Sequence, residues 1–71
     1  MDDKKLRALL TAVQCGSFGK ATAQLGYTQS GISHMMKSLE EEVGFPLLVR
    51  TATGIRPNPE GEMLLPYIRE L

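Results

Sequence analysis

Three glycines, Gly16, Gly26 and Gly44, each close a stretch of sequence in which apolar residues recur at helical spacing. A glycine just beyond the last apolar residue of such a stretch is typical of a helix end. The short interval between Gly16 and Gly26 leaves room for a helix of about two turns, with Ser17 as its N-terminal cap. The spacing therefore predicts a short helix between two longer ones, joined by tight turns.

The third segment, residues 28–44, begins with residues that disfavour a helix. Its opening letters, TQSGIS, include a glycine and three hydroxyl side chains. The apolar residues nevertheless recur along one helical face, at Ile32, Met36, Leu39 and Val43. Thr28 can cap this helix, and small side chains in its first turn allow close approach of another molecule. Because the first N–H groups of a helix are unpaired and favour phosphate, we interpret this turn as a contact surface.

The hydrophobic period changes after Phe45. Residues 47–50 are predicted to form a short strand, and residues 55–57 the returning strand. The letters TATG between them indicate a turn, with Gly54 available for a positive φ. Two short strands are not stable alone, so we expect this hairpin to rest on the helices.

A fourth helix is predicted to begin at Asn58 and Pro59, a capping residue followed by proline at the first helical position. Pro66 interrupts its hydrogen bonding. Its apolar stripe is expected to be exposed and covered by the same helix of a second copy, with packing on the first helix as the alternative. That predicted dimer interface consists of Leu64, Ile68 and Leu71. Because the pattern still runs at the last residue, we expect the chain to be the front of a longer protein.

Length and composition exclude several classes of site. A chain of 71 residues is one small domain with little room for an enzyme's cleft. Cys15 is the sole cysteine and His34 the sole histidine, so neither an intramolecular disulfide nor a zinc-ligand set is expected. We expect no enzymatic activity, no cofactor and no metal. No apolar run approaches the roughly 20 residues of a membrane span, and the N-terminus does not resemble a signal peptide. A cytoplasmic location without membrane contact is therefore expected.

The net charge is zero, but the charges are unevenly distributed. From Lys4 to Leu39 the chain has no Asp or Glu, whereas it has basic residues at Lys4, Lys5, Arg7, Lys20 and Lys37. A locally positive stretch favours a nucleic-acid partner. A chance distribution on an ordinary surface is the alternative.

The order of elements is that of a winged helix-turn-helix, a mainly α-helical fold with a three-helix core, a short β-hairpin wing and a C-terminal linker helix. We assign residues 1–58 to this DNA-binding domain, with the helix-turn-helix near 18–37 and the wing near 47–57, and residues 59–71 to the start of the linker helix. In this fold the third helix enters the major groove. A winged-helix module that binds a protein is the alternative function.

The stretch GSFGKATAQLGYTQSGISHMMKSLEEEVGFPLLVRT resembles the N-terminal domain of LysR-type transcriptional regulators. The likeness rests on the Ser-Phe pair that opens the second helix, the Thr-Gln pair that opens the third, and the Leu-Glu-x-x-x-Gly segment before a strand ending in Arg. It implies a bacterial regulator that binds double-stranded DNA sequence-specifically. It also implies a homodimer formed through the linker helix, and a further C-terminal domain that binds a small effector.

The resemblance also implies which residues contact the operator. In the third helix they are Thr28, Gln29, Ser30, Ser33, His34 and Lys37, and at the wing they are Arg50 and Thr53. Thr28 is expected to act mainly as a cap, and an ion pair between Arg50 and a glutamate late in the third helix is the alternative for that arginine. The family often has proline at the position of Ser30 and arginine at that of His34.

Overall fold

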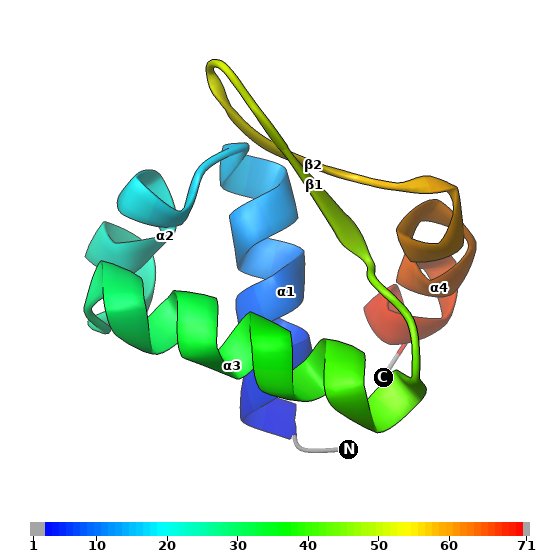
Figure 1. The fold of residues 1–71 in the computed structure, drawn as a ribbon. Helices are drawn as coiled ribbons and strands as arrows, with labels where there is room; N and C mark the ends of the chain where they lie inside the picture. The colour runs from blue at the N-terminus through cyan, green and yellow to red at the C-terminus, as the bar shows by residue number, and fades with distance from the viewer. Residues whose placement is uncertain (1–2, 71) are drawn as a thin grey trace.

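The computed structural model describes residues 3–70. The elements follow the order α1 (Asp3–Cys15), α2 (Phe18–Leu25), α3 (Gln29–Val43), β1 (Leu48–Thr51), β2 (Gly54–Pro57) and α4 (Pro59–Arg69) (Figure 1). Four helices and one antiparallel hairpin confirm the predicted winged helix-turn-helix. No helix within residues 3–70 combines the length and the apolar character needed to cross a membrane.

The predicted caps define the helix ends. At the C-terminal ends, Gly26 and Gly44 adopt φ values of +75° and +91°, and their N–H groups donate to carbonyls of the preceding helix. At the N-terminal ends, side-chain oxygens accept backbone N–H groups of the first turn, from Lys20 to Ser17, from Gly31 to Thr28 and from Gly61 to Asn58. Each cap satisfies a backbone group that the helix itself leaves unpaired.

Helix α1 forms the centre of the molecule, with α2 and α4 on either side and α3 crossing it (Figure 1). Its Ala8, Leu9 and Ala12 are at most 1% exposed, so neighbouring helices approach its backbone closely. The largest fully buried side chains come from α1, α3 and the segment before β1, namely Leu9, Ile32, Leu39 and Leu47. The core therefore fixes α3 against α1 by its apolar face.

The hairpin is attached to the helices through its backbone. β1 and β2 pair with Leu48 opposite Pro57 and Thr51 opposite Gly54. The N–H of Ile55 donates to the carbonyl of Gly16, at 2.9 Å, which ties β2 to the turn between α1 and α2. Gly54 adopts φ +154°, as predicted, and a Cβ there would collide with the same Gly16 carbonyl. Position 54 therefore requires glycine for two reasons, namely the backbone conformation and the close approach of the Gly16 carbonyl.

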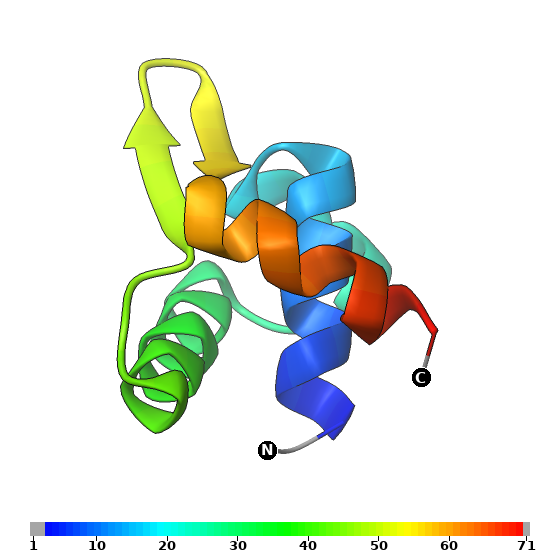
Figure 2. The ribbon, with the colours of Figure 1, turned by 90° about the vertical axis from the view of Figure 1, so that its right-hand side faces the viewer.

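Helix α4 lies against α1, and this contact corrects one expectation (Figure 2). Ile68 belongs to the core and is only 7% exposed. Leu64 is half-buried and packs against the core. Ile68 therefore faces this chain's own core, which was the alternative, whereas Leu64 also lines an open groove on the other side of α4. Leu71, the third predicted interface residue, lies outside the described residues.

The free side of α4 carries other apolar side chains. Met63 is 74% exposed and Tyr67 is 71% exposed. Together with Phe45 and Pro66 they line an open groove on the surface. The helix continues through Pro66, which is exposed, so water can reach the carbonyl that proline leaves without a donor.

Candidate nucleic-acid interface

Helix α3 has one buried and one exposed face, divided as the apolar pattern predicts. Ile32, Met36 and Leu39 are at most 3% exposed. The predicted contact residues on the other side are exposed, namely Gln29, Ser30, His34 and Lys37, whereas Ser33 is half-buried. Because no element within residues 3–70 covers the polar face, its side chains are available to a partner along the first two to three turns of the helix.

The first turn of α3 is built around the hydroxyl of Thr28. Its Oγ1 accepts the N–H of Gly31 at 3.0 Å and lies 3.4 Å from Oγ of Ser30. A Cβ at Gly31 would lie only 3.0 Å from the same Thr28 Oγ1. The glycine thus leaves room for the cap, in addition to keeping the first turn slender. Thr28 serves as the cap, as expected.

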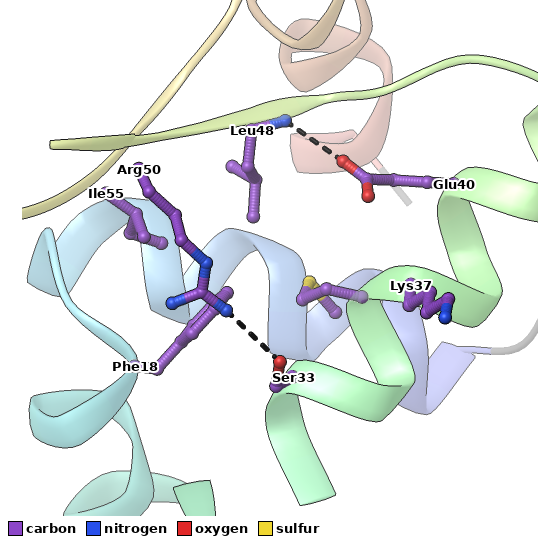
Figure 3. A pocket seen from close by; sticks show the side chains of 8 residues that line it. Phe18, Ser33, Lys37, Glu40, Leu48, Arg50 and Ile55 are labelled. Carbon is purple, nitrogen blue, oxygen red and sulfur yellow. Dashed lines mark hydrogen bonds between the residues drawn. The ribbon is translucent and has the colours of Figure 1, made fainter. Parts of the chain in front are cut away.

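A groove separates α3 from the wing, and Arg50 crosses it from β1 (Figure 3). Nη2 of Arg50 donates to Oγ of Ser33 at 3.2 Å. The guanidinium carbon also lies 5.2 Å from the ring centroid of Phe18, within the range of a cation–π contact. These contacts differ from the glutamate partner considered for Arg50. They hold its head group between α2 and α3 while the residue as a whole stays exposed.

Glu40 contacts the wing by accepting hydrogen bonds from backbone N–H groups. Its Oε2 accepts the N–H of Leu47 at 2.7 Å and the N–H of Leu48 at 3.2 Å (Figure 3 draws the second). In the sequence Glu40 is the first of three consecutive glutamates near the end of the helix, and a glutamate there was expected to contact the wing, if at all, through Arg50. No local pattern identifies its role, because its partners lie beyond the turn at Gly44 and present only backbone atoms.

The positions of Lys5, Lys37 and Thr53 complete the description of this surface. Nζ of Lys5 donates to Glu42 at 2.5 Å and to Ser38 at 2.8 Å, so an acid of α3 offsets one charge of the acid-free stretch. Lys37 lines the same groove as Arg50. Thr53 is exposed in the turn between β1 and β2, at the end of the wing. Lys37 and Arg50 therefore place two positive groups in the groove beside the exposed face of α3.

Comparison with known proteins places this geometry in context. Residues 4–62 match the family described as bacterial regulatory helix-turn-helix protein, lysR family. The chain is 44% identical over 62 residues to the transcriptional regulator MetR of Escherichia coli K12, covering 87% of the chain and 20% of that protein. It is 40% identical over 63 residues to the transcriptional activator AmpR of Rhodobacter capsulatus, covering 89% of the chain and 22% of AmpR. The chain thus spans about a fifth of the length of these relatives.

Two solved structures that resemble the chain contain DNA. The complex of the BenM DNA-binding domain with catB site 1 DNA matches with a TM-score of 0.92 and 33% identity, over 99% of this chain and 79% of that one. The CbnR DNA-binding domain in complex with DNA matches with a TM-score of 0.93 and 27% identity, over 99% of this chain and 80% of that one.

Proposed function

This chain belongs to the lysR family of bacterial regulatory helix-turn-helix proteins, and we propose that it binds specific double-stranded DNA with α3 in the major groove and the wing beside it. The observation that carries the proposal is the exposed polar face of α3, opposite a face that is sealed into the core. The DNA complexes of BenM and CbnR, which share the fold, support it.

Different residues on the exposed face of α3 have different roles. Gln29 and Ser30 lie in the first turn, where a helix in the major groove brings side chains to base edges. His34 and Lys37 follow one and two turns later, where contact shifts towards phosphates. Ser33 donates its hydroxyl proton to DNA while accepting from Arg50. Thr28, Arg50 and Thr53 add contacts to the sugar-phosphate backbone.

The assembly is a proposal as well. We propose a homodimer formed through the open side of α4, where Met63 and Tyr67 are exposed beside Phe45. Two-fold symmetry in the protein would be matched by an inverted repeat in the DNA. Effector binding is assigned to a further domain, as the family resemblance implies. The protein acts as a binding module in the cytoplasm and not as an enzyme.

Selection from a pool of random duplexes, followed by titration at several salt concentrations, tests the proposal. Enrichment of one sequence motif is expected, with an affinity that falls steeply as salt rises, because binding to phosphates releases counterions. No enrichment and a flat salt dependence would instead favour a protein-interaction module.

A further inference from the structure

Glu40 is an acidic residue in the groove that also contains Lys37 and Arg50 (Figure 3). A carboxylate close to DNA phosphates opposes binding. Whatever Glu40 contributes to recognition must therefore come through contacts inside the protein. Its hydrogen bonds are of that kind, because one carboxylate oxygen accepts both the Leu47 and the Leu48 N–H groups.

Helix α3 is joined to β1 at two levels. Glu40 holds the beginning of β1, and Ser33 holds the side chain of Arg50 near its end. The two α3 residues are seven positions apart, which corresponds to about 10 Å along a helix. A single attachment would let the strand pivot on the helix, whereas two attachments fix its angle.

The remaining anchors of the hairpin hold it to other elements. The Ile55 N–H binds the turn after α1, and Asn58 binds the carbonyls of Pro46 and Leu47. The Ile55 bond acts on β2, and the Asn58 bonds hold the residues just before β1 to the beginning of α4. The two bridges from α3 are the hydrogen bonds that join β1 and its side chains directly to that helix.

We propose that Glu40 is a positioning residue for DNA recognition. Glu40 holds Leu47 and Leu48 and thereby fixes the position of the wing relative to α3. When Gln29 contacts a base edge, this position determines where Arg50 and Thr53 contact the duplex. The inference rests on the proposed function. On a specific site the base contacts of α3 fix the position of the protein, so the distance between the wing contacts and the helix contacts affects affinity. On random DNA the protein can shift along the duplex, so that distance affects affinity much less.

The test compares three variants on the selected duplex and on a random duplex. Glu40→Ala removes both the charge and the acceptor. Glu40→Gln removes the charge but keeps an oxygen acceptor. Glu41→Ala removes a neighbouring exposed charge and serves as the control for electrostatics.

Glu40→Ala is expected to lower the ratio of specific to random affinity by about tenfold, comparable to one mismatched base pair. Glu40→Gln and Glu41→Ala are expected to keep the ratio within about twofold. Both remove a negative charge, so they raise the two affinities together. In an Arg50→Ala background, where Thr53 is the remaining wing contact that Glu40 positions, the effect of Glu40→Ala on the ratio is expected to be clearly smaller.

An unchanged ratio in Glu40→Ala, or the same loss in the Arg50→Ala background, would overturn the inference while leaving specific DNA binding intact. If the unmodified chain does not discriminate between duplexes, the proposed function fails and the inference with it. Thermal unfolding of each variant separates positioning from loss of fold. Should Glu40→Ala not fold, Glu40→Asp, which keeps the charge but is one methylene shorter, is expected to show the same loss of ratio, and a normal ratio would refute the role.

Discussion

Single side chains on the exposed face of α3 lie at different positions along the helix. Gln29 belongs to the first turn and Lys37 lies two turns further on, and both are exposed. An amide side chain pairs with the edge of adenine, whereas a lysine acts as a point charge for phosphate. The two residues are therefore expected to contribute different parts of the binding free energy.

Gln29→Ala is expected to cost about 1–3 kcal/mol on the selected site and to relax preference at one base position. Lys37→Ala is expected to weaken binding to all duplexes and to lower the slope of affinity against salt by about one counterion. Titration of both variants on specific and random DNA measures the two effects side by side. Equal losses on both duplexes for Gln29→Ala, with base preference intact, would exclude it as a base-reading residue.

The effect of a substitution on the stability of a helix depends on the residues packed against that helix as well as on helix propensity. Gly19 and Gly61 both lie in the first turn of a helix, α2 and α4. A Cβ at Gly19 would make ordinary contacts, whereas a Cβ at Gly61 would collide with the carbonyl oxygen of Leu47. The same change should therefore have opposite signs at the two sites.

Gly61→Ala is expected to destabilise the chain by about 1–3 kcal/mol, as overpacking does. Gly19→Ala is expected to stabilise it by up to about 1 kcal/mol, because alanine favours the helix. Denaturant unfolding of both variants gives the two free energies. A stabilised Gly61→Ala variant would show that α4 can move away from Leu47 at no cost.

The elements also show what a sequence can and cannot predict. The ends of α2 and α3 were predictable because Ser17, Thr28, Gly26 and Gly44 act within their own turns. The orientation of the wing was not, because it depends on residues far apart in the chain. Glu40 meets the N–H groups beyond the next turn, and Ile55 meets the carbonyl of Gly16. The partners of Arg50 were missed for the same reason.

At the scale of the whole molecule, the open side of α4 carries the two most exposed large hydrophobic side chains of residues 3–70, Met63 and Tyr67. Tyr67→Glu is expected to convert a concentration-dependent dimer into a folded monomer, measured by sedimentation, because it places a charge in the proposed interface. Val49→Glu, at another exposed apolar residue, is the control and should leave the dimer intact. Ile68→Glu is expected to unfold the chain, since it charges the core. An unmodified chain that stays monomeric at high concentration would count against this interface.

The bond between the Ile55 N–H and the Gly16 carbonyl also has a consequence for the order in which parts of the chain fold. It joins the beginning of the chain to its later part, so it closes a long loop and forms after contacts between neighbours in sequence. During synthesis α1, α2 and α3 leave the ribosome before β2 exists, and they can collapse around Leu9 and Ile32. The proposed DNA-binding surface includes the wing, so it is expected to be completed only after β2 has left the ribosome and reached the turn at Gly16.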